Sequence, residues 1–233
     1  MNPAPRAYTC VGGGLFMTVL VHNIQANRME RFGRDLREPM PYADETMTVG
    51  EFRGRSLSDL VWTTSQTMQS WVAFRRMWGA PIYAPYVFRR IGEGGHAAQS
   101  QHYAGTAFDV GQNLTNARRA QMRQLAQRSG LWSYVEPASL TPTWVHFDRR
   151  LGPPACDAGY PLQRLGSIGV YVCILQDALN VVTGFSLSID GVFGPLTVAR
   201  VRIFQALNRL VPDGVVGCAT WRALTSQALG ALG

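Results

Sequence analysis

An eight-residue pattern that occurs twice near the C-terminal end constrains the fold more than any other sequence feature. Residues 190–197 and 213–220 share the pattern Asp-Gly-Val-x-Gly-x-x-Thr, and the copies start 23 residues apart. In each copy the Asp can cap its own turn, the Gly can adopt a positive φ, and the Thr can act as N-cap of the next helix. Apolar spacing predicts helices at 170–182, 198–210 and 221–229. This region is therefore predicted to be a compact all-α bundle of three helices.

A segment with two adjacent prolines and spaced glycines, residues 151–161, precedes the repeat and interrupts regular structure. The 233 residues suffice for one substantial core and one smaller core. We therefore predict a first domain at 1–150 with its core at about 48–150, a linker at 151–164, and the helical domain at 165–233.

The first domain is predicted to be α+β, with a small antiparallel sheet and flanking helices. Apolar residues at helical spacing predict one helix at 56–78, which ends at Gly79, and another at 114–129. Three strands are predicted from β-branched and aromatic residues, at 82–88, 132–136 and 144–148. The apolar run at 15–21 is interpreted as a first buried strand rather than a secretory signal, because no small-x-small cleavage site follows it.

Composition restricts the classes of partner. All 22 basic residues are arginine and the formal net charge is +7, which favours attraction to a polyanion such as nucleic acid or a bacterial cell wall. No basic run or nucleic-acid-binding motif is present, so nucleic-acid binding is the weaker interpretation. No stretch approaches the roughly 18 uninterrupted apolar residues that a membrane-spanning helix requires.

The four cysteines, Cys10, Cys156, Cys173 and Cys218, are far apart in the sequence. They form no Cys-x-x-Cys pair, which argues against a structural zinc site or a redox motif. Cys173 and Cys218 lie within apolar helical patterns and are expected to be buried thiols rather than members of a disulfide.

Four short segments add detail to the helical region: Leu175-Gln176, Asp190-Gly191-x-Phe193-Gly194-x-x-Thr197, Phe204-Gln205, and Asp213-Gly214-Val215-Val216-Gly217-x-x-Thr220-Trp221. With them, the chain from about residue 169 onward resembles the three-helix peptidoglycan-binding domain. This resemblance implies that the domain binds bacterial peptidoglycan, without assigning the contact to individual residues. The alternative is a helical bundle in which the repeat only builds turns and core.

The chemically richest stretch of the first domain is Ser-Gln-His-Tyr-Ala-Gly-Thr-Ala-Phe-Asp at residues 100–109, and His146 follows 37 residues after Asp109. Two imidazoles and a carboxylate suit catalytic Zn²⁺, because three protein ligands leave a fourth position for water. Gly105 lets the chain turn so that His102 and Asp109 can converge. Each residue also has an ordinary explanation as a turn, cap or strand residue, and spacing alone does not decide between them.

The pattern Ser-x-His-x-x-Gly-x-Ala-x-Asp, followed by Val-His-Phe-Asp, closely resembles the zinc D-alanyl-D-alanine carboxypeptidase family over about residues 48–150. That family includes wall-lytic endopeptidases, phage endolysins and vancomycin-resistance dipeptidases. The resemblance implies that His102, Asp109 and His146 bind one Zn²⁺. It also implies hydrolysis of peptide bonds in peptidoglycan stem peptides or cross-links, by an extracellular or wall-associated monomer. Exo or endo cleavage, D,D or L,D bonds, host or phage origin and the export route stay open.

The general base is the point at which the sequence departs from the family. The family commonly has an acidic residue three positions before its second zinc histidine, where this chain has Thr143. A wall-binding protein without catalytic activity is therefore the alternative to an enzyme. Against it stands the complete set of His102, Asp109, His146 and Arg89.

Strand geometry suggests a replacement for the missing acid. If the last two predicted strands form a hairpin with Tyr134 opposite His146 and Glu136 opposite Trp144, then Glu136, His146 and Asp148 share one face. We therefore predict Glu136 as general base, with an exposed strand-end carboxylate as the alternative. Asp148 is predicted to orient a metal-binding histidine.

Substrate-binding residues are predicted near the first zinc histidine. Arg89 and Arg90 follow Phe at the place where the family has an aromatic-arginine pair, so the resemblance implies that Arg89 holds a substrate carboxylate or the anionic intermediate. Arg90 is expected to be its solvated neighbour. Ser100 and Gln101 are predicted to hydrogen-bond the substrate, with capping of the turn as the alternative for Ser100. His96 is expected on a loop without a ligand role.

Overall fold

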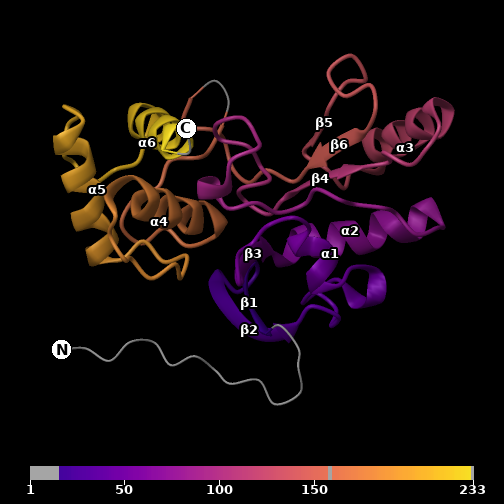
Figure 1. Cartoon of the computed structure of the whole chain (residues 1–233), viewed down its shortest axis with the longest axis horizontal. Helices are drawn as coiled ribbons and strands as arrows, with labels where there is room; N and C mark the ends of the chain where they lie inside the picture. The colour runs from indigo at the N-terminus through magenta and orange to yellow at the C-terminus, as the bar shows by residue number, and fades with distance from the viewer. Residues whose placement is uncertain (1–15, 157–158, 232–233) are drawn as a thin grey trace.

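The computed structural model describes residues 16–156 and 159–231 and shows an α+β chain, as predicted (Figure 1). The strands are β1 (Phe16–Asn23), β2 (Arg28–Asp35), β3 (Leu60–Thr64), β4 (Ala107–Val110), β5 (Tyr134–Val135) and β6 (Val145–Asp148). The helices are α1 (Val49–Arg53), α2 (Ser65–Trp78), α3 (Asn116–Ser129), α4 (Val170–Thr183), α5 (Pro195–Leu207) and α6 (Cys218–Gly230), with short 3-10 helices η1 (Asp44–Thr46) and η2 (Ile91–Glu93). Within these two described stretches, no helix is long and apolar enough to span a membrane.

The first sheet has the order β2-β1-β3, in which β1 runs antiparallel to β2 and parallel to β3. The central strand is buried at Val19, Leu20 and Val21. The predicted buried strand at 15–21 is therefore confirmed for its described residues. The sheet is mixed, because β1 and β3 are parallel.

The predicted helix at 56–78 is wrong in its first part, where the chain forms strand β3 before helix α2 begins. Thr63 and Thr64 are β-branched, which favours an extended backbone, and the Thr64 side chain caps α2 by accepting a backbone N–H of its first turn. Gly79 ends the helix as predicted, in the left-handed conformation with a φ of 74°.

The second sheet is antiparallel with the order β4-β6-β5. The last two predicted strands correspond to β5 and β6, and the predicted helix at 114–129 corresponds to α3. The predicted strand at 82–88 is wrong, since this segment forms a single bridge from Tyr86 to β4. Pro81 and Pro85 have no backbone N–H to donate, so the segment cannot continue a ladder of hydrogen bonds.

In the C-terminal module (residues 165–233), a buried glutamine holds each copy of the repeat. The Gln176 Oε1 accepts two backbone N–H groups of the first loop, each at 3.0 Å, and its Nε2 donates to Asp190 at 2.8 Å. Gln205 repeats this arrangement in the second loop, where it accepts a backbone N–H at 2.9 Å and donates to Asp213 at 3.0 Å. Both loops are thus fixed from inside the bundle.

The repeat residues take two of their three predicted roles. Each Asp accepts a backbone N–H of its own turn, and Gly191 and Gly214 have φ of 72° and 79°. The predicted N-cap role of the threonines is wrong, because glycines occupy the N-cap positions of α5 and α6. Thr197 and Thr220 are instead buried, and their hydroxyls accept hydrogen bonds from the two glutamine side chains.

The C-terminal module packs directly on the N-terminal part of the chain. Arg90 forms a bidentate ion pair with the buried Asp177 of α4, at 2.8 and 2.5 Å. Arg90 is therefore not a solvated neighbour of Arg89, because its guanidinium joins the two parts. The predicted linker at 151–164 has no helix or strand among its described residues, but Tyr160 within it is fully buried.

The expectation for the cysteines is wrong at Cys218, which forms a disulfide with Cys156. Cys218 is the first residue of α6, so its side chain lies at the end of the helix beside the segment that leads into the module. Cys173 is a buried free thiol as expected, and Cys10 lies outside the described residues.

Candidate functional site

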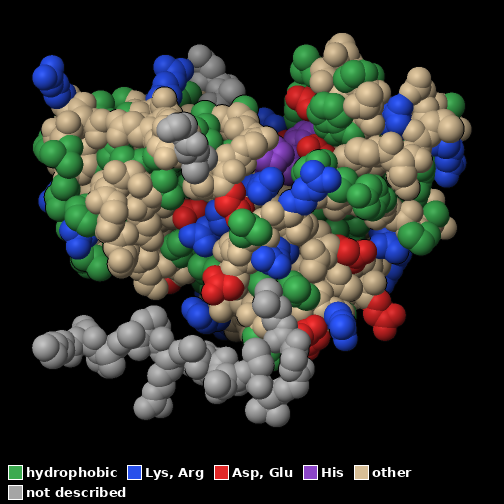
Figure 2. All heavy atoms as spheres, in the orientation of Figure 1, with side chains coloured by type: hydrophobic (Ala, Val, Ile, Leu, Met, Phe, Trp, Pro, Cys, Tyr) green, Lys and Arg blue, Asp and Glu red, His purple; other side chains and the backbone are tan. Residues whose placement is uncertain are grey.

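A pocket of about 550 Å³ opens between residues 95–102 and the second sheet. Figure 2 shows histidine side chains at the bottom of this hollow, with acidic and basic groups beside them. The pocket is lined by residues 95–102, Asp109, Gly159 and six alternate residues of β5, β6 and their flanks: Tyr134, Glu136, Trp144, His146, Asp148 and Arg150.

His102 is held by a tight turn that packs against strand β3. The Gly105 N–H donates to the His102 carbonyl at 3.1 Å, and the Thr63 hydroxyl donates to the Gly105 carbonyl at 2.7 Å. Gly105 has a φ of 65°, and a Cβ there would lie 1.9 Å from the Trp62 carbonyl oxygen. Only glycine fits this turn, as predicted from its place between His102 and Asp109.

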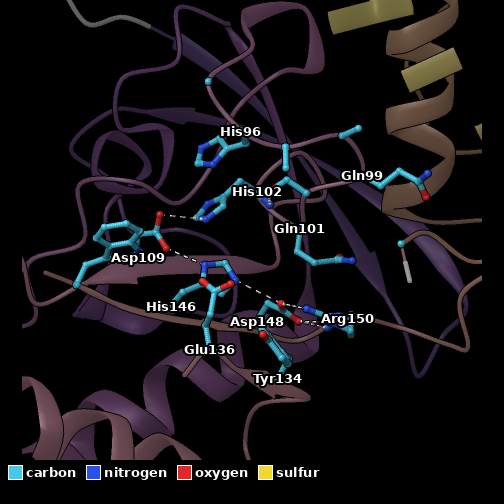
Figure 3. Close-up of a pocket in the computed structure, with 16 residues that line it drawn as sticks. His96, Gln99, Gln101, His102, Asp109, Tyr134, Glu136, His146, Asp148 and Arg150 are labelled. Atoms are coloured by element: carbon cyan, nitrogen blue, oxygen red, sulfur yellow. Dashed lines mark hydrogen bonds and ion pairs between the residues drawn. The ribbon is translucent and has the colours of Figure 1, made fainter. Parts of the chain in front are cut away.

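Asp109 and His146 are directly opposite each other on the paired strands β4 and β6. Residues opposite each other in an antiparallel pair project to the same face. The Asp109 Oδ1 lies 2.7 Å from His146 Nδ1, and its Oδ2 lies 3.3 Å from His102 Nε2 (Figure 3). The structure therefore places both predicted histidine ligands against the predicted carboxylate ligand. The group whose ligand atoms all lie within 4.8 Å of one another is, however, His96, His102 and Asp109, and it does not include His146.

The donor atoms at this point suit a zinc ion. The Nδ1 of His102 lies 3.0 Å from the Val87 carbonyl and donates to it, which directs Nε2 towards the pocket. That Nε2 is buried and has no hydrogen-bond partner among the described residues. A buried nitrogen without a partner, beside a carboxylate and a second imidazole, is the arrangement that a metal ion would complete.

Electrostatic coupling between these groups shifts their pKa values in opposite directions. Burial lowers the pKa of His146, but hydrogen bonds to the Asp109 and Asp148 carboxylates outweigh burial and raise this pKa to about 9. Burial raises the pKa of Asp109, but the neighbouring imidazoles of His102 and His146 hold it well below its usual range. Without metal, His146 is therefore an imidazolium between two carboxylates at neutral pH.

Asp148 lies behind His146, on the side away from Asp109. Its carboxylate is fully buried, with Oδ2 at 3.4 Å from His146 Nε2. Arg150 donates to both carboxylate oxygens of Asp148, at 2.8 and 2.5 Å, and its guanidinium lies 4.4 Å from the centre of the Tyr134 ring. Asp148 thus occupies the position expected for a residue that orients His146.

Glu136 lines the pocket on the same face as His146 and Asp148, but the predicted strand pairing is wrong by two residues. Tyr134 pairs with Asp148 rather than with His146, and the Glu136 N–H donates to the His146 carbonyl at 2.9 Å rather than lying opposite Trp144. A shift of two residues preserves the face that each side chain occupies. The predicted common face is therefore correct.

The pairing differs because the connection between β5 and β6 is longer than a simple hairpin turn. The backbone N–H groups of Leu140 and Thr141 both donate to the Pro137 carbonyl. Arg123 of α3 donates to the carbonyls of Glu136, Thr141 and Trp144, at 2.8 to 3.0 Å. These bonds stabilise a loop that extends as far as Trp144.

The predicted substrate-binding residues occupy three different surroundings. Arg89 is not among the residues that line the pocket, and its Nη1 lies 3.4 Å from the Arg55 carbonyl. Ser100 lines the pocket while its hydroxyl accepts the His102 N–H at 3.3 Å, the capping role given as its alternative. Gln101 lines the pocket, and its Oε1 accepts hydroxyl groups of Thr106 and Tyr171.

Two ionisable side chains of the pocket, those of His96 and Arg150, were not predicted as site residues, and His96 was expected to have no ligand role. His96 lies beside the ligands, with its ring stacked on His102 at 4.1 Å between centroids, and its ligand atom falls within 4.8 Å of those of His102 and Asp109. Burial, followed by the neighbouring His102, lowers the pKa of His96 to about 3. Arg150 follows the strand motif at a spacing of two from Asp148, and this alternation was the available signal.

Comparison with known proteins supports the function expected for the module. Residues 169–224 match the family model described as "Putative peptidoglycan binding domain". A curated relative from Kitasatospora aureofaciens, "Uncharacterized protein in bpoA1 3'region", is 50% identical over 40 residues, which are 17% of this chain and 34% of that protein. The chain thus matches about a third of the length of this relative.

Two solved structures are similar to parts of the chain. One is a fused Zn-dependent amidase/peptidase/peptidoglycan-binding domain-containing protein from Clostridium acetobutylicum, 40% identical over 27% of this chain and 28% of that chain, with a TM-score of 0.26. The other is a periplasmic domain of the EpsAB fusion protein of the Vibrio vulnificus type II secretion system, 23% identical over 41% of each chain, with a TM-score of 0.29. At these TM-scores neither similarity bears on the fold or activity of this chain.

Proposed function

We propose that this protein is a zinc metallopeptidase that hydrolyses peptide bonds in the stem peptides or cross-links of bacterial peptidoglycan, and that its C-terminal module holds it on the cell wall. The observation that carries the proposal is the convergence of His102, Asp109 and His146 in one pocket of a chain whose other part matches a peptidoglycan-binding family. Binding to the wall raises the local concentration of scissile bonds at the pocket.

Three further pocket residues, Glu136, Asp148 and Arg150, have roles in this proposal. His102, Asp109 and His146 would hold a zinc ion, which would act as a Lewis acid on the scissile carbonyl and would lower the pKa of bound water. Glu136, which lines the pocket beside His146, accepts the proton of the attacking water. Asp148 accepts a hydrogen bond from His146 Nε2 and keeps Nδ1 directed towards Asp109. Arg150 takes the role predicted for Arg89, a cation for the substrate carboxylate or the developing negative charge, because Arg150 faces the pocket.

The proposal is tested by analysing muropeptides after purified peptidoglycan is incubated with the protein. Cleavage products are expected with the zinc-loaded protein, lost after treatment with a chelator, and restored by added Zn²⁺. The masses of the products identify the bond and separate carboxypeptidase from endopeptidase activity. A protein that binds zinc and peptidoglycan but releases no product from any wall type would be a binding protein without hydrolytic activity.

The metal-free protein is expected to lose stability as the pH rises from about 6.5 to 9. The pKa of His146 is raised from 6.5 to about 9 in the folded state. The stabilisation that the protonated His146 gives the folded state is therefore fully present below pH 6.5 and is lost as the pH rises through 9. The free energy of unfolding should fall by an amount on the order of 3 kcal/mol. Urea unfolding of chelator-treated protein measures this change, and an equal fall in a His146→Ala variant would contradict its assignment to His146.

A further inference from the structure

Residues 95–101 form the wall of the pocket that faces the C-terminal module. They lead directly into His102, and all seven line the pocket. They lie outside the helices and strands, and Gln99 has a φ of 60°, which is uncommon for a residue with a side chain. This segment, which we call the pocket loop, thus depends on contacts from elsewhere for its shape.

The Tyr103 hydroxyl holds His96 near the start of the loop. Contacts to residues 99–101 come from two buried tyrosines on the C-terminal side of the chain. The backbone N–H of Tyr160 donates to Gln99 Oε1 at 3.0 Å, and its hydroxyl donates to the Ser100 carbonyl at 2.7 Å. The hydroxyl of Tyr171, on α4, donates to Gln101 Oε1 at 3.0 Å and accepts the Leu151 N–H at 3.1 Å. Three consecutive residues of the pocket loop are therefore hydrogen-bonded to the C-terminal side.

The chain at Gly159 approaches Gln99 of the pocket loop so closely that a side chain at residue 159 would clash. A Cβ at Gly159 would lie 2.2 Å from Gln99 Oε1, and Gly159 has a φ of 115°. Gly159 itself lines the pocket. The C-terminal side of the chain thus supplies part of the pocket surface as well as support behind it.

The position of α4 relative to the pocket is fixed by a second, independent contact. Asp177 accepts two bonds from the Arg90 guanidinium and one from the backbone N–H of Ile91. The same guanidinium lies over the Trp62 ring, at 5.1 Å from its centroid. Because Arg90 and Ile91 are fixed in this way, α4 cannot move far without breaking a buried ion pair.

We infer that Tyr160 and Tyr171 are positioning residues of the hydrolytic site, so that the linker and the peptidoglycan-binding module together shape the pocket, in addition to the module holding the protein on the wall. The inference rests on the proposed function for its catalytic consequence. It gives the module a second effect: loosening the tyrosine contacts should weaken hydrolysis even of a soluble peptide, for which attachment to the wall is irrelevant.

The test compares Tyr171→Phe and Tyr160→Phe with Tyr42→Phe in the full chain. Tyr42 is a matched control, because its hydroxyl also donates one bond, to Glu30, and accepts one, from Asn23, away from the pocket. Thermal unfolding, amide hydrogen exchange of peptides covering residues 95–102, and kcat/KM on a soluble stem peptide are measured for each variant.

We expect exchange in the pocket loop to become about fivefold faster in Tyr171→Phe, the change that loss of one hydrogen bond produces. The kcat/KM should fall by about tenfold or more, while Tyr42→Phe matches the wild type in both. Tyr160→Phe should change both measurements in the same direction as Tyr171→Phe. The inference would be overturned if the exchange rates and the kcat/KM values of both pocket variants matched those of Tyr42→Phe. A wild-type protein that cleaves no peptide would refute the proposed function instead, and the exchange rates would still decide whether the tyrosines hold the loop.

Discussion

Replacement of His146 by alanine is expected to abolish hydrolysis of peptidoglycan, with a fall in kcat/KM of about a thousandfold or more. The variant loses one of the three proposed metal ligands and leaves the half-buried carboxylate of Asp109 without its 2.7 Å partner. Zinc content after dialysis should fall with the activity. Metal analysis and muropeptide release on the same sample measure both effects.

The matched control for this variant is His22→Ala. His22 is also a buried imidazole, but it lies on β1, outside the pocket lining, where both ring nitrogens lack partners among the described residues. This control should keep wild-type zinc content and activity. Full activity in His146→Ala, or zinc loss of equal extent in His22→Ala, would remove His146 from the set of ligands.

Replacement of Glu136 by glutamine is expected to reduce kcat by about 10²- to 10⁴-fold while zinc content stays at the wild-type level. Glutamine keeps the size and hydrogen-bonding shape of the side chain but cannot accept the proton of the attacking water. Hydrolysis of a soluble stem peptide, followed by product mass, measures kcat and KM separately. A loss confined to kcat is the expected signature.

Thr143→Ala serves as the control. Thr143 occupies the position at which the zinc D-alanyl-D-alanine carboxypeptidase family, which this sequence resembles, commonly has an acidic residue. Its side chain is exposed and does not line the pocket, so activity should not change. If Thr143→Ala were impaired and Glu136→Gln were active, the proton would be removed by a route through residue 143, and the assignment of Glu136 would be wrong.

The local chemistry of this chain could be predicted from the sequence because it depends on short-range constraints. Gly105 permits one sharp turn between His102 and Asp109, and strand alternation places Glu136, His146 and Asp148 on a common face. The duplicated Asp-Gly loops predict their own turns in the same way. In each case the inference uses residues that are neighbours in the sequence, alternate along one strand or face each other across one predicted hairpin.

The errors arise where a distant contact decides the local structure. Residues 60–64 have apolar spacing compatible with a helix, but pairing with β1 makes them a strand. The pairing of β5 with β6 depends on the guanidinium of Arg123 from α3. His96 enters the site because Tyr103 donates to its carbonyl and accepts its N–H. None of these contacts follows from local propensity or periodicity.

The disulfide between Cys156 and Cys218 has a consequence for how the protein withstands cleavage by proteases. It encloses α4, α5 and both repeat loops between its ends. A protease that cuts once in an exposed turn of this stretch, such as the turn after α5, would open the chain without releasing either piece. Both fragments would remain covalently joined, so a nicked molecule keeps its wall-binding helices attached to its pocket.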